Sequence, residues 1–569
     1  MILKGGGELS DEILKKYFNM NFFENVEEEF KDAFGRNFKT NLKKDFIKID
    51  DILSEDISYH DMILISGDFY GIQKFIFDRL GNKNASKVIR AKSAFIQIFT
   101  EVIAKYICEK FGDKTNILSV TAGKFEILSQ NKDENLINNI QDELDDYFIK
   151  NFYGLSGMSI SFVECKKEDF FEPEKYRKLR DDITEKIEKK KFNKFNLQKQ
   201  KNYVLENDKG IDNQSLCRIC NIRKINPDFD NCCTICNGFI NLGEKLVRNE
   251  KHIFAQKHLN INFINNDIRI ELTEKIKSFV AKDSKKGILD FDELAENARK
   301  KFDDNNITGL KAIAVLKADV DNMGTFIKYK DKDKDSGVTE SFENYDVFSK
   351  TLDSFFSLHI PNKMKKEFPN TYTVFAGGDD LFLVGAWDEI LSLARWIEKE
   401  FKAFVKGKEL TISFGIAIAN SSIPISYLAH HTEHLLEEAK EIDGKDAITL
   451  FGETVKWNSY KDARKKIKAL KIENVEIFDL KNQDINTALL YRLLDFCEMS
   501  KQIKKYIDCK GEVECDFRNA LWKSKLRYVF YRNMDKKYHN MISELDTIID
   551  KYPSETKMFL CEFIYKRRG

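Results

Sequence analysis

Proline, long apolar runs and an excess of charge of either sign are scarce or missing in this sequence. Six of the 569 residues are proline and no stretch is of low complexity, so we expect a chain folded throughout its length. No apolar run approaches the roughly 18 residues of a membrane span. Lys and Arg number 93, as do Asp and Glu, so any nucleic-acid-binding surface has to be local. The first residues, MILKGGGELSDE, lack the apolar segment of a signal peptide, and we expect a cytoplasmic protein.

Helical and strand patterns divide the chain into five predicted parts. At roughly 150 residues per domain, a chain of this length holds about four domains. The patterns predict an α+β multidomain protein. Its predicted parts are a helical N-terminal segment (1–60), a first α/β unit (61–170), a helical linker domain with a cysteine cluster (171–305), a second α/β unit (306–457) and a helical C-terminal domain (458–569).

The two α/β units share the predicted order strand, helix, strand, strand, helix, strand. In the first unit the strands are DMILISGDFYG, ILSVTAGKFEIL (a hairpin) and MSISFVEC. In the second they are KAIAVLKADVDNMG, TYTVFAGGDDLFLVGA (a hairpin) and ELTISFGIAIA. This order is that of a ferredoxin-like fold.

The two units look like an internal duplication. Asp68 ends the first strand of one unit and Asp319 ends the first strand of the other, and a hairpin turn follows each at a similar distance. The units differ at that turn, where the first has Lys124 and Phe125 and the second has an Asp-Asp pair. We therefore expect the first unit to lack a catalytic metal, because a lysine there repels a divalent ion but attracts a nucleotide phosphate.

The second unit gathers carboxylates at the ends of two strands that are predicted neighbours in the sheet. Asp319 and Asp321 follow the first strand, and Asp379 and Asp380 lie at the tip of the hairpin. Such a cluster repels itself unless cations are bound, and Mg²⁺ or Mn²⁺ prefers oxygen ligands. Two such ions stabilise the attacking and the leaving oxygen of a phosphoryl displacement. We predict a two-metal nucleotidyl-transfer site at Asp319, Asp379 and Asp380, against the alternative of a plain Gly-Gly-Asp-Asp turn.

Residues around these aspartates are suited to holding a nucleotide. Two glycines before the Asp-Asp pair permit a tight turn and close backbone approach. The loop after the first strand can offer backbone N–H groups to phosphates. Two lysines in EEAKEIDGKDAITLF can carry triphosphate charge, with a solvated surface role as the equal alternative for each. The predicted residues are Gly377, Gly378, Asn322, Gly324, Lys440 and Lys445.

Five of the eleven cysteines fall close together in the linker domain. Cys217-x-x-Cys220 and Cys233-x-x-Cys236 form two pairs with the spacing of a tetrahedral Cys₄ zinc site. The alternative is four unrelated buried thiols, and Cys232 is the ambiguous fifth cysteine. Four thiolates leave no open position for water, so we expect a structural site in a reducing compartment.

Histidines and a basic run give weaker signals. The His60-Asp61 pair has no other histidine near it, and a nuclease reading is therefore disfavoured. HHTEH at 430–434 fits the H-x-x-E-H pattern of some metalloproteases, but it lies on a predicted helix, where a solvated face is the favoured reading. Phe192 and Phe195 lie among the lysines of the basic run KIEKKKFNKFNLQKQK (186–201), which can touch RNA or a partner, although a solvated helix is favoured again.

Taken together, these motifs resemble a known family. FAGGDDLFLVG, preceded by LKADVDNMG and followed by ISFGIAIA and AKEIDGKDAITLFGETVKW, resembles the palm of GGDEF-type nucleotide cyclases. It resembles more closely the second palm of the large subunit of type III CRISPR effector complexes. LISGDFYGIQKFIF, IRAKSAFIQIF and TAGKFEIL are similar to that family's first palm, and SKLRYVFYRNM to the helical tail of its Csm-type (III-A) members. The resemblance runs from about residue 61 to residue 535.

The resemblance implies an activity and partners. In this family the two palms bind two ATP molecules, here with Ser66, Asp68 and Lys124 of the first unit, and Val320 joins the three aspartates at the Mg²⁺ or Mn²⁺ ions. Capture of target RNA switches on synthesis of cyclic 3′–5′ oligoadenylates. The implied partners are other Csm subunits, crRNA and target RNA, and the four cysteines hold structural Zn²⁺. Family members usually begin with an HD nuclease domain, for which the residues before 61 are too few, so we expect no DNA cleavage from this chain.

Two other functions stay open from the sequence. A stand-alone cyclase that makes a cyclic dinucleotide needs only the second unit, but such cyclases do not combine two palms, a zinc module and a helical tail. A non-catalytic scaffold of the complex is the other alternative, and the intact Asp319, Asp379 and Asp380 argue against it.

Overall fold

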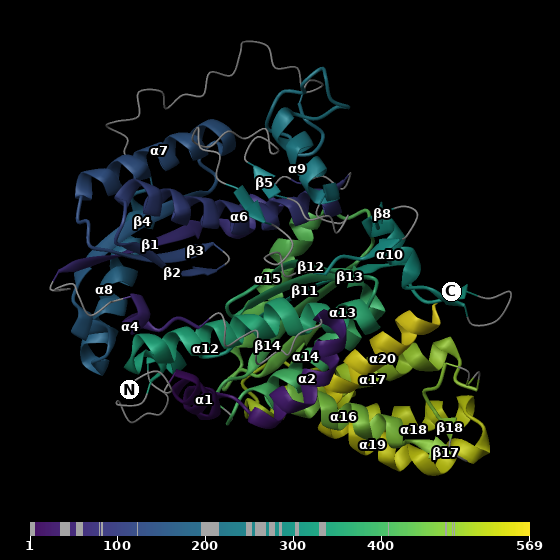
Figure 1. Cartoon of the computed structure of the whole chain (residues 1–569). Helices are drawn as coiled ribbons and strands as arrows, with labels where there is room; N and C mark the ends of the chain where they lie inside the picture. Colours follow the sequence, from purple (N-terminus) through teal and green to yellow (C-terminus); the bar gives the residue numbers. More distant parts are fainter. Residues whose placement is uncertain are drawn as a thin grey trace.

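The structure is a computed structural model, and its two main β-sheets, of four and six strands, have helices around them (Figure 1). It describes residues 6–34, 46–52, 61–78, 80, 84–121, 123–194, 216–245, 253–255, 269–271, 279–283, 287–301, 307–328, 337–407, 409–472, 475–480, 482 and 484–568. Within these residues, no helix combines the length and the apolar character that crossing a membrane requires.

The first unit is built on a four-stranded antiparallel sheet. Its strands are β1 (Met62–Tyr70), β2 (Thr115–Thr121), β3 (Lys124–Ser129) and β4 (Gly157–Cys165), in the spatial order β2-β3-β1-β4. Helices α6 (Ala85–Phe111) and α7 (Glu134–Phe152) cross between the strands, after a short helix α5 (Ile72–Phe77). Helix α8 (Pro173–Phe192) packs on β1 and β4, and its buried Leu179 and Ile183 share a core with Met62 and Leu64. The sheet is therefore covered on both faces.

The second unit is built on a six-stranded sheet. Its strands are β11 (Ile313–Val320), β12 (Thr371–Gly377), β13 (Asp380–Ala386), β14 (Ile412–Ala419), β15 (Ala447–Leu450) and β16 (Glu453–Lys456), in the order β12-β13-β11-β14-β15-β16. Its helices are α11 (Met323–Lys328), α12 (Phe342–Ser354), α13 (Ile360–Glu367), α14 (Trp387–Phe404) and α15 (Ile425–Glu441). The pair β15–β16 extends the sheet beyond the β-α-β-β-α-β unit; the sequence AITLF predicts the first of these two strands but not the second.

The helix predicted after the first strand of each unit is interrupted in the structure. The stretch after β1 is split into α5 and α6, and the stretch before β12 passes through a π-helical turn (Phe355–His359). Pro361 follows that turn in the first positions of α13. Proline has no N–H to donate in the helical ladder, which accounts for a change of hydrogen-bond pattern just before it.

The two faces of the second sheet have different partners because side chains alternate along a strand. Ala314 and Leu316 of β11 point into a core shared with α12 and α14. Ile313 and Val315 point the other way, into a core that is continuous with the first unit. We call this second side the open face, because the crossing helices α12 and α14 do not cover it and leave it to α15 and the first unit. Helix α15 packs on the open face, over β11 and β14.

The N-terminal helices belong to the second unit, although they come first in the sequence. Helix α1 (Gly6–Tyr17) packs on α12, and α2 (Met20–Phe34) packs on α14. Between them Phe18 stacks on Phe348, with ring centroids 5.5 Å apart, and lies 4.8 Å from the ring of Phe404. A short helix α4 (Ile49–Ile52) precedes the first sheet.

The linker and the C-terminal part contain the remaining elements. The linker has α9 (Thr234–Lys245), α10 (Phe291–Asn297) and the short strands β5 (Ile253–Ala255), β6 (Arg269–Glu271), β7 (Lys282–Asp283), β8 (Gly287–Ile288), β9 (Lys300–Lys301) and β10 (Ile307–Thr308). The C-terminal part has α16 (Trp457–Ala469), β17 (Lys471–Ile472), β18 (Val475–Glu476), α17 (Thr487–Asp508), α18 (Trp522–Asn533), α19 (Ile542–Lys551) and α20 (Pro553–Arg567). In Figure 1 these last helices lie at the lower right, in yellow and yellow-green.

Candidate catalytic site and cysteine cluster

Two of the predicted catalytic aspartates face each other across neighbouring strands. Asp319 near the end of β11 is the register partner of Asp380 at the start of β13. The Val320 N–H donates to the main-chain oxygen of Asp379, 3.2 Å away, which holds the hairpin turn against the end of β11. By strand alternation, Asp319 and Asp380 lie on the open face, the side of Val315 and Phe382.

The carboxylate oxygens of this site are not gathered as tightly as the cysteines are. Among the described residues, one group of three or more potential metal ligands has all its ligand atoms within 4.8 Å of one another, and it is the cysteine group. The strand register therefore brings Asp319 and Asp380 to adjacent positions, whereas the three aspartate side chains do not converge on one point in this structure.

Asp321 has a different role from Asp319, although both belong to one Asp-x-Asp motif. Its side chain is fully buried, and Oδ2 accepts hydrogen bonds from Thr411 Oγ1 (2.7 Å), Ser413 Oγ (2.9 Å) and the Asp446 N–H (3.1 Å). Asn322 follows with a positive φ of 60°, so the chain turns away from the strand here. Asp321 thus fixes the loop before β15, and Asp319 is the carboxylate on the open face.

Helix α15 brings two side chains of opposite charge to β11. Lys440 pairs with Asp319, and Glu433 pairs with Lys317. Glu433 and Lys440 are seven residues apart, and hence on one side of the helix. Lys317 and Asp319 are two residues apart, and hence on one face of the strand. Two ion pairs therefore join β11 to α15. The helix supplies the ammonium group in one pair and the carboxylate in the other.

A glycine sets the distance between α15 and the sheet. A Cβ atom at Gly415 of β14 would lie 2.4 Å from the Leu436 nitrogen and 2.6 Å from the Thr432 oxygen. Both are main-chain atoms of α15, which cannot move aside as a side chain can. The helix therefore rests directly on the β14 main chain at this point.

The environment of Asp380 shifts its ionisation. Burial raises the pKa of Asp380 to about 6, the Lys317 ammonium lowers it, and the carboxylates of Asp379 and Glu433 raise it. Lys124 of the first unit also lowers this pKa, so its positive charge reaches the second unit's site. This is the observation that brings a predicted residue of the first unit to the predicted catalytic residues of the second.

The remaining predicted residues of the second unit surround this site. Gly378 has a φ of 64° with open space around it, and its N–H donates to Asp353 Oδ1 of α12, 3.2 Å away. Asn322 and Gly324 are exposed next to the end of β11. Lys445 is half-buried in the loop after α15. Gly377 ends β12 opposite Asp380.

In the first unit, the register corrects the predicted equivalence of the two turns. Asp68 pairs with Lys124 across β1 and β3, as Asp319 pairs with Asp380. Lys124 therefore occupies the position of Asp380, not that of Asp379. Phe125, fully buried, corresponds to Leu381. The prediction was one residue out because the sequence shows the turn motif but not which of its residues begins the strand.

Asp68 is neutralised by two ammonium groups. Lys124 Nζ lies 3.7 Å from Asp68 Oδ2, and Lys191 Nζ of α8 lies 2.9 Å from the same oxygen. Ser66, two residues earlier on β1, pairs with Glu126 of β3. Lys191 is a residue that sequence reasoning passed over, since it was one lysine in the basic run 186–201.

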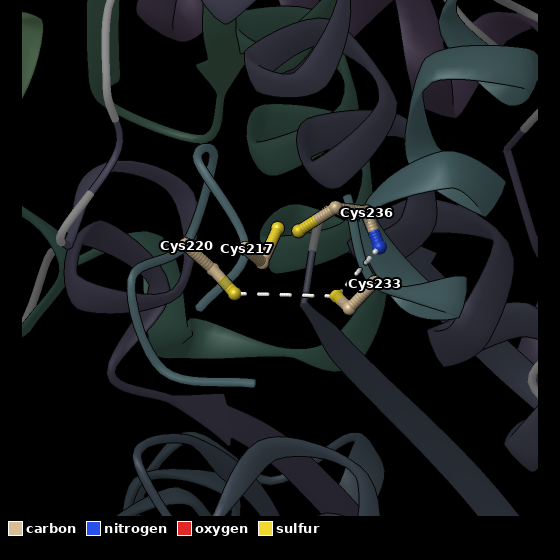
Figure 2. Close-up of side chains that lie close together, drawn as sticks. All are labelled: Cys217, Cys220, Cys233 and Cys236. Atoms are coloured by element: carbon tan, nitrogen blue, oxygen red, sulfur yellow. Dashed lines mark hydrogen bonds between the residues drawn. The ribbon is translucent and has the colours of Figure 1, made fainter. Parts of the chain in front are cut away.

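Four cysteines form a compact buried cluster (Figure 2). Cys217 and Cys220 come from a loop, and Cys233 and Cys236 come from the start of α9. All four are at most 6% exposed, and the Sγ atoms of Cys220 and Cys233 are 4.0 Å apart. Cys232 is equally buried but lies outside the group, which answers the ambiguity left by the sequence.

The four thiols of the cluster share their protons unequally. The Cys236 N–H donates to Cys233 Sγ at 3.4 Å. Hydrogen bonding with the Cys217 thiol lowers the pKa of Cys220, whereas it raises the pKa of Cys236. Burial lowers the pKa of Lys92 on α6 to about 8, and the charges of Cys236 and Cys220 act in the opposite direction. Lys92 is therefore a half-buried positive charge near the cluster.

The weaker sequence signals have separate outcomes. His430, His431 and His434 are exposed on α15, with His434 Nδ1 3.2 Å from Glu438 Oε1. The solvated-face interpretation therefore holds for the three histidines, whereas Thr432 is buried and Glu433 pairs with Lys317. The basic run is helical as far as Phe192, and its residues 195–201 lie outside the described residues, as does His60.

Comparisons with known proteins agree with this architecture. The family profile described as "Cas10/Cmr2, second palm domain" matches residues 312–449, and that described as "Csm1 subunit domain B" matches residues 61–208. A relative from Methanocaldococcus jannaschii is 28% identical over 69% of this chain and 59% of its own length. One from Enterococcus italicus is 26% identical over 82% of this chain and 63% of its own length.

The chain belongs to the Cas10/Csm1 family. Both relatives bear the name "CRISPR system single-strand-specific deoxyribonuclease Cas10/Csm1 (subtype III-A)". The chain spans about six-tenths of the length of these Cas10/Csm1 relatives. Its second unit is the one that the palm profile matches.

Solved Cas10/Csm1 structures have the same fold. A Csm1-Csm4 cassette in complex with cA3 has a TM-score of 0.60 at 19% identity, over 87% of this chain and 71% of that one. A cassette in complex with AMPPNP also has a TM-score of 0.60, at 18% identity, over 87% and 70%. The Csm1-Csm4 subcomplex of the type III-A interference complex has a TM-score of 0.58 at 19% identity, over 87% and 71%.

Proposed function

We propose that this chain joins ATP into cyclic 3′–5′ oligoadenylate as the large subunit of a type III-A CRISPR complex. The observation that carries the proposal is the register pair Asp319–Asp380 on the open face, beside the turn that holds Asp379. Structurally similar Csm1-Csm4 cassettes have been solved in complex with cA3 and with AMPPNP, which supports an adenine nucleotide as the substrate.

The donor set suits a hard divalent cation. Asp319, Asp379 and Asp380 offer carboxylate oxygens, and Val320 offers its main-chain carbonyl, all of them ligands that Mg²⁺ and Mn²⁺ prefer. These residues would hold the metal ions of the reaction. When bound, the ions supply activation of a ribose 3′-hydroxyl and stabilisation of the leaving pyrophosphate. The raised pKa of Asp380 fits a carboxylate that awaits a cation.

The chain's own cations are placed to bind phosphate. Lys440 lies on Asp319 and Lys124 acts on Asp380 from the other unit, so the site has positive charge on both sides. Gly378, with nothing near its missing side chain, leaves room for a nucleotide at the turn. Lys124 and Lys191 around Asp68 give the first unit a phosphate-binding pair without a carboxylate pair for metal.

The cysteine cluster fits zinc. Four buried sulfur ligands within 4.8 Å match a closed tetrahedral site, which supports folding and leaves no position for a substrate. Cys217, Cys220, Cys233 and Cys236 would therefore hold structural Zn²⁺. The GGDEF-like palm, the zinc-containing linker and the domain boundaries given above remain part of this proposal.

The partners and the second activity follow from the family. We propose other Csm subunits, crRNA and target RNA as partners, since a similar chain is named as part of a Csm1-Csm4 subcomplex. The relatives' name specifies cleavage of single-stranded DNA. We keep the prediction that this stretch of chain does not cleave DNA itself, and the stand-alone cyclase and the scaffold remain the alternatives.

One experiment tests the proposal against both alternatives. Purified protein is incubated with ATP or GTP and Mn²⁺, with and without its ribonucleoprotein and target RNA. We expect oligoadenylate from ATP in the RNA-bound complex, and a loss of at least about 10³-fold when Asp379 and Asp380 are both replaced by Ala. A cyclic dinucleotide made without RNA supports the stand-alone cyclase. Synthesis near the parent rate by the double variant places the catalytic centre elsewhere.

A further inference from the structure

We infer that Gln73 and Phe77 of α5 seat the first unit on the cross-strand pair Lys317–Phe382, directly behind the pair Asp319–Asp380. This inference rests on the proposed function, because it gives these residues the task of positioning the two units for one reaction. Gln73 and Phe77 are positioning residues in this account, since they reach the catalytic carboxylates through other side chains.

The contacts come from one side of a short helix. Residues 73 and 77 are four apart, and hence neighbours on one helix face. Gln73 Nε2 donates to Glu433 Oε2, 2.9 Å away, and the same oxygen accepts from Lys317. The rings of Phe77 and Phe382 are 4.6 Å apart between centroids. Helix α5 therefore makes one polar and one aromatic contact with the second unit.

Both contacts end on the same place in the sheet. Lys317 and Phe382 are register partners across β11 and β13, and the pair two residues further is Asp319–Asp380. Side chains two residues apart on a strand share a face, so the seat and the aspartates are adjacent on the open face. A shift of α5 by a fraction of an ångström therefore moves the side chains next to the reacting groups.

Lys317 makes the polar contact costly to lose. Its side chain is 7% exposed, whereas that of Glu433 is 31% exposed. A buried ammonium needs a partner, because breaking a buried ion pair leaves an uncompensated charge. Glu433 supplies that partner, and Gln73 of the first unit fixes the position of the Glu433 carboxylate. The two units are thereby tied through three side chains.

The first test is Gln73→Ala, with Lys74→Ala on the same exposed stretch of α5 as the matched control. Small misplacements of reacting groups cost up to about 10²-fold in rate, so we expect Gln73→Ala to lower kcat about tenfold. The KM for ATP from steady-state kinetics and the Kd for Mn²⁺ from calorimetry should each change less than about twofold, because every metal ligand and phosphate-binding lysine is intact. Lys74→Ala should match the parent.

An exchange of the two polar groups gives a sharper test. Gln73→Glu places a carboxylate against Glu433 and should lower kcat more than Gln73→Ala does. Adding Glu433→Gln restores a donor and an acceptor in exchanged positions but leaves Lys317 without the carboxylate of residue 433, so it should recover part of the loss. Failure of the exchange to recover activity, together with a parent-like kcat for Gln73→Ala, would overturn the inference.

Thermal unfolding separates this inference from the proposed function. Gln73→Ala and Glu433→Ala should lower the unfolding temperature non-additively, because they remove the same bond, whereas Gln73→Ala and His430→Ala should be additive. If Glu433→Ala does not fold, Glu433→Leu with Lys317→Met replaces it. If the changes in unfolding temperature are non-additive but the protein makes no oligoadenylate, the contact of α5 with the second unit is supported and the proposed function is contradicted. If they are additive in an active protein, only the inference about α5 is contradicted.

Discussion

Lys124 holds in the first sheet the register position that Asp380 holds in the second. The same place in two related sheets thus carries opposite charges. Lys124 also acts electrostatically on Asp380 itself, so the two equivalent positions meet across the boundary between the units. The two units therefore differ in charge at one equivalent register position, which is Lys124 in the first sheet and Asp380 in the second.

Replacing this lysine should affect nucleotide binding more than chemistry. We expect Lys124→Ala to raise KM for ATP about tenfold, the size of one charge-assisted hydrogen bond, with a smaller change in kcat. Steady-state kinetics in the RNA-bound complex measures both. Lys110→Ala, an exposed lysine at the end of α6, is the control. A fall in kcat at constant KM would mean that Lys124 acts in the chemical step.

The raised pKa of Asp380 predicts how metal binding depends on pH. Asp380 is protonated below about pH 6, because its pKa is raised to about 6. The affinity of the site for Mn²⁺ should therefore fall as pH decreases through that value, by up to about tenfold per pH unit. Calorimetric titration at several pH values checks this. The sign for stability is opposite: the folded state holds this proton more tightly, so stability is lost as pH rises through about 6. Asp380→Asn should therefore stabilise the metal-free protein at neutral pH, and a destabilised variant would contradict the raised pKa.

The cysteine cluster predicts about one tightly bound zinc ion per chain. Metal analysis of protein purified without chelator should find it. Cys236→Ser should abolish zinc retention and lower the unfolding temperature, because metal binding contributes to folding. Cys232→Ser is the matched control, since Cys232 is as buried as the others but lies outside the group. Equal loss of zinc in both variants would contradict the ligand assignment.

Glu562 should be important for the stability of the C-terminal part. It is 2% exposed, and it accepts from Arg395 of α14 at 3.1 Å, from Arg464 of α16 at 3.3 Å and from Lys566 at 2.6 Å. Burial acts to raise the pKa of Glu562, but these cations hold it far below the usual range. Glu562→Gln should lower the free energy of unfolding by about 3–5 kcal/mol at neutral pH.

The pH dependence of this effect has a definite sign. Because the folded pKa is depressed, the stabilisation is present above the unfolded value of about 4.3 and is lost as pH falls below it. Urea unfolding at neutral and acidic pH measures the difference. Asp550→Asn removes an exposed pair with Lys523 and should cost less than about 1 kcal/mol. Equal effects of the two variants would show that burial of Glu562 gives it no special weight.

Local patterns were enough to predict most of the elements around the site. The strand that ends at Asp319 and the hairpin with Asp379 and Asp380 have alternating or continuous apolar residues, which are visible without tertiary structure. The cysteine spacing also predicted which four thiols the structure brings together. These features depend on neighbours along the chain, and so the sequence contains them directly.

Contacts between distant segments could not be predicted in this way. Nothing near Phe18 in the sequence indicates that it packs against Phe404. The role of Glu433 was hidden in a histidine-rich motif, and its partner Gln73 belongs to another unit. Lys317 did leave a signal, because a lysine inside the apolar run KAIAVLKADV, two residues before Asp319, has to find a buried partner.

The absence of a side chain at Gly415 determines how α15 packs on the sheet. Added atoms there would collide with the main chain of α15 and lift the helix from the sheet. Lys440 and Glu433 would rise together, although neither is near residue 415 in the sequence. The distance of α15 from the sheet, which the absence of a side chain at Gly415 permits, thus decides whether the pairs Lys440–Asp319 and Lys317–Glu433 can form together.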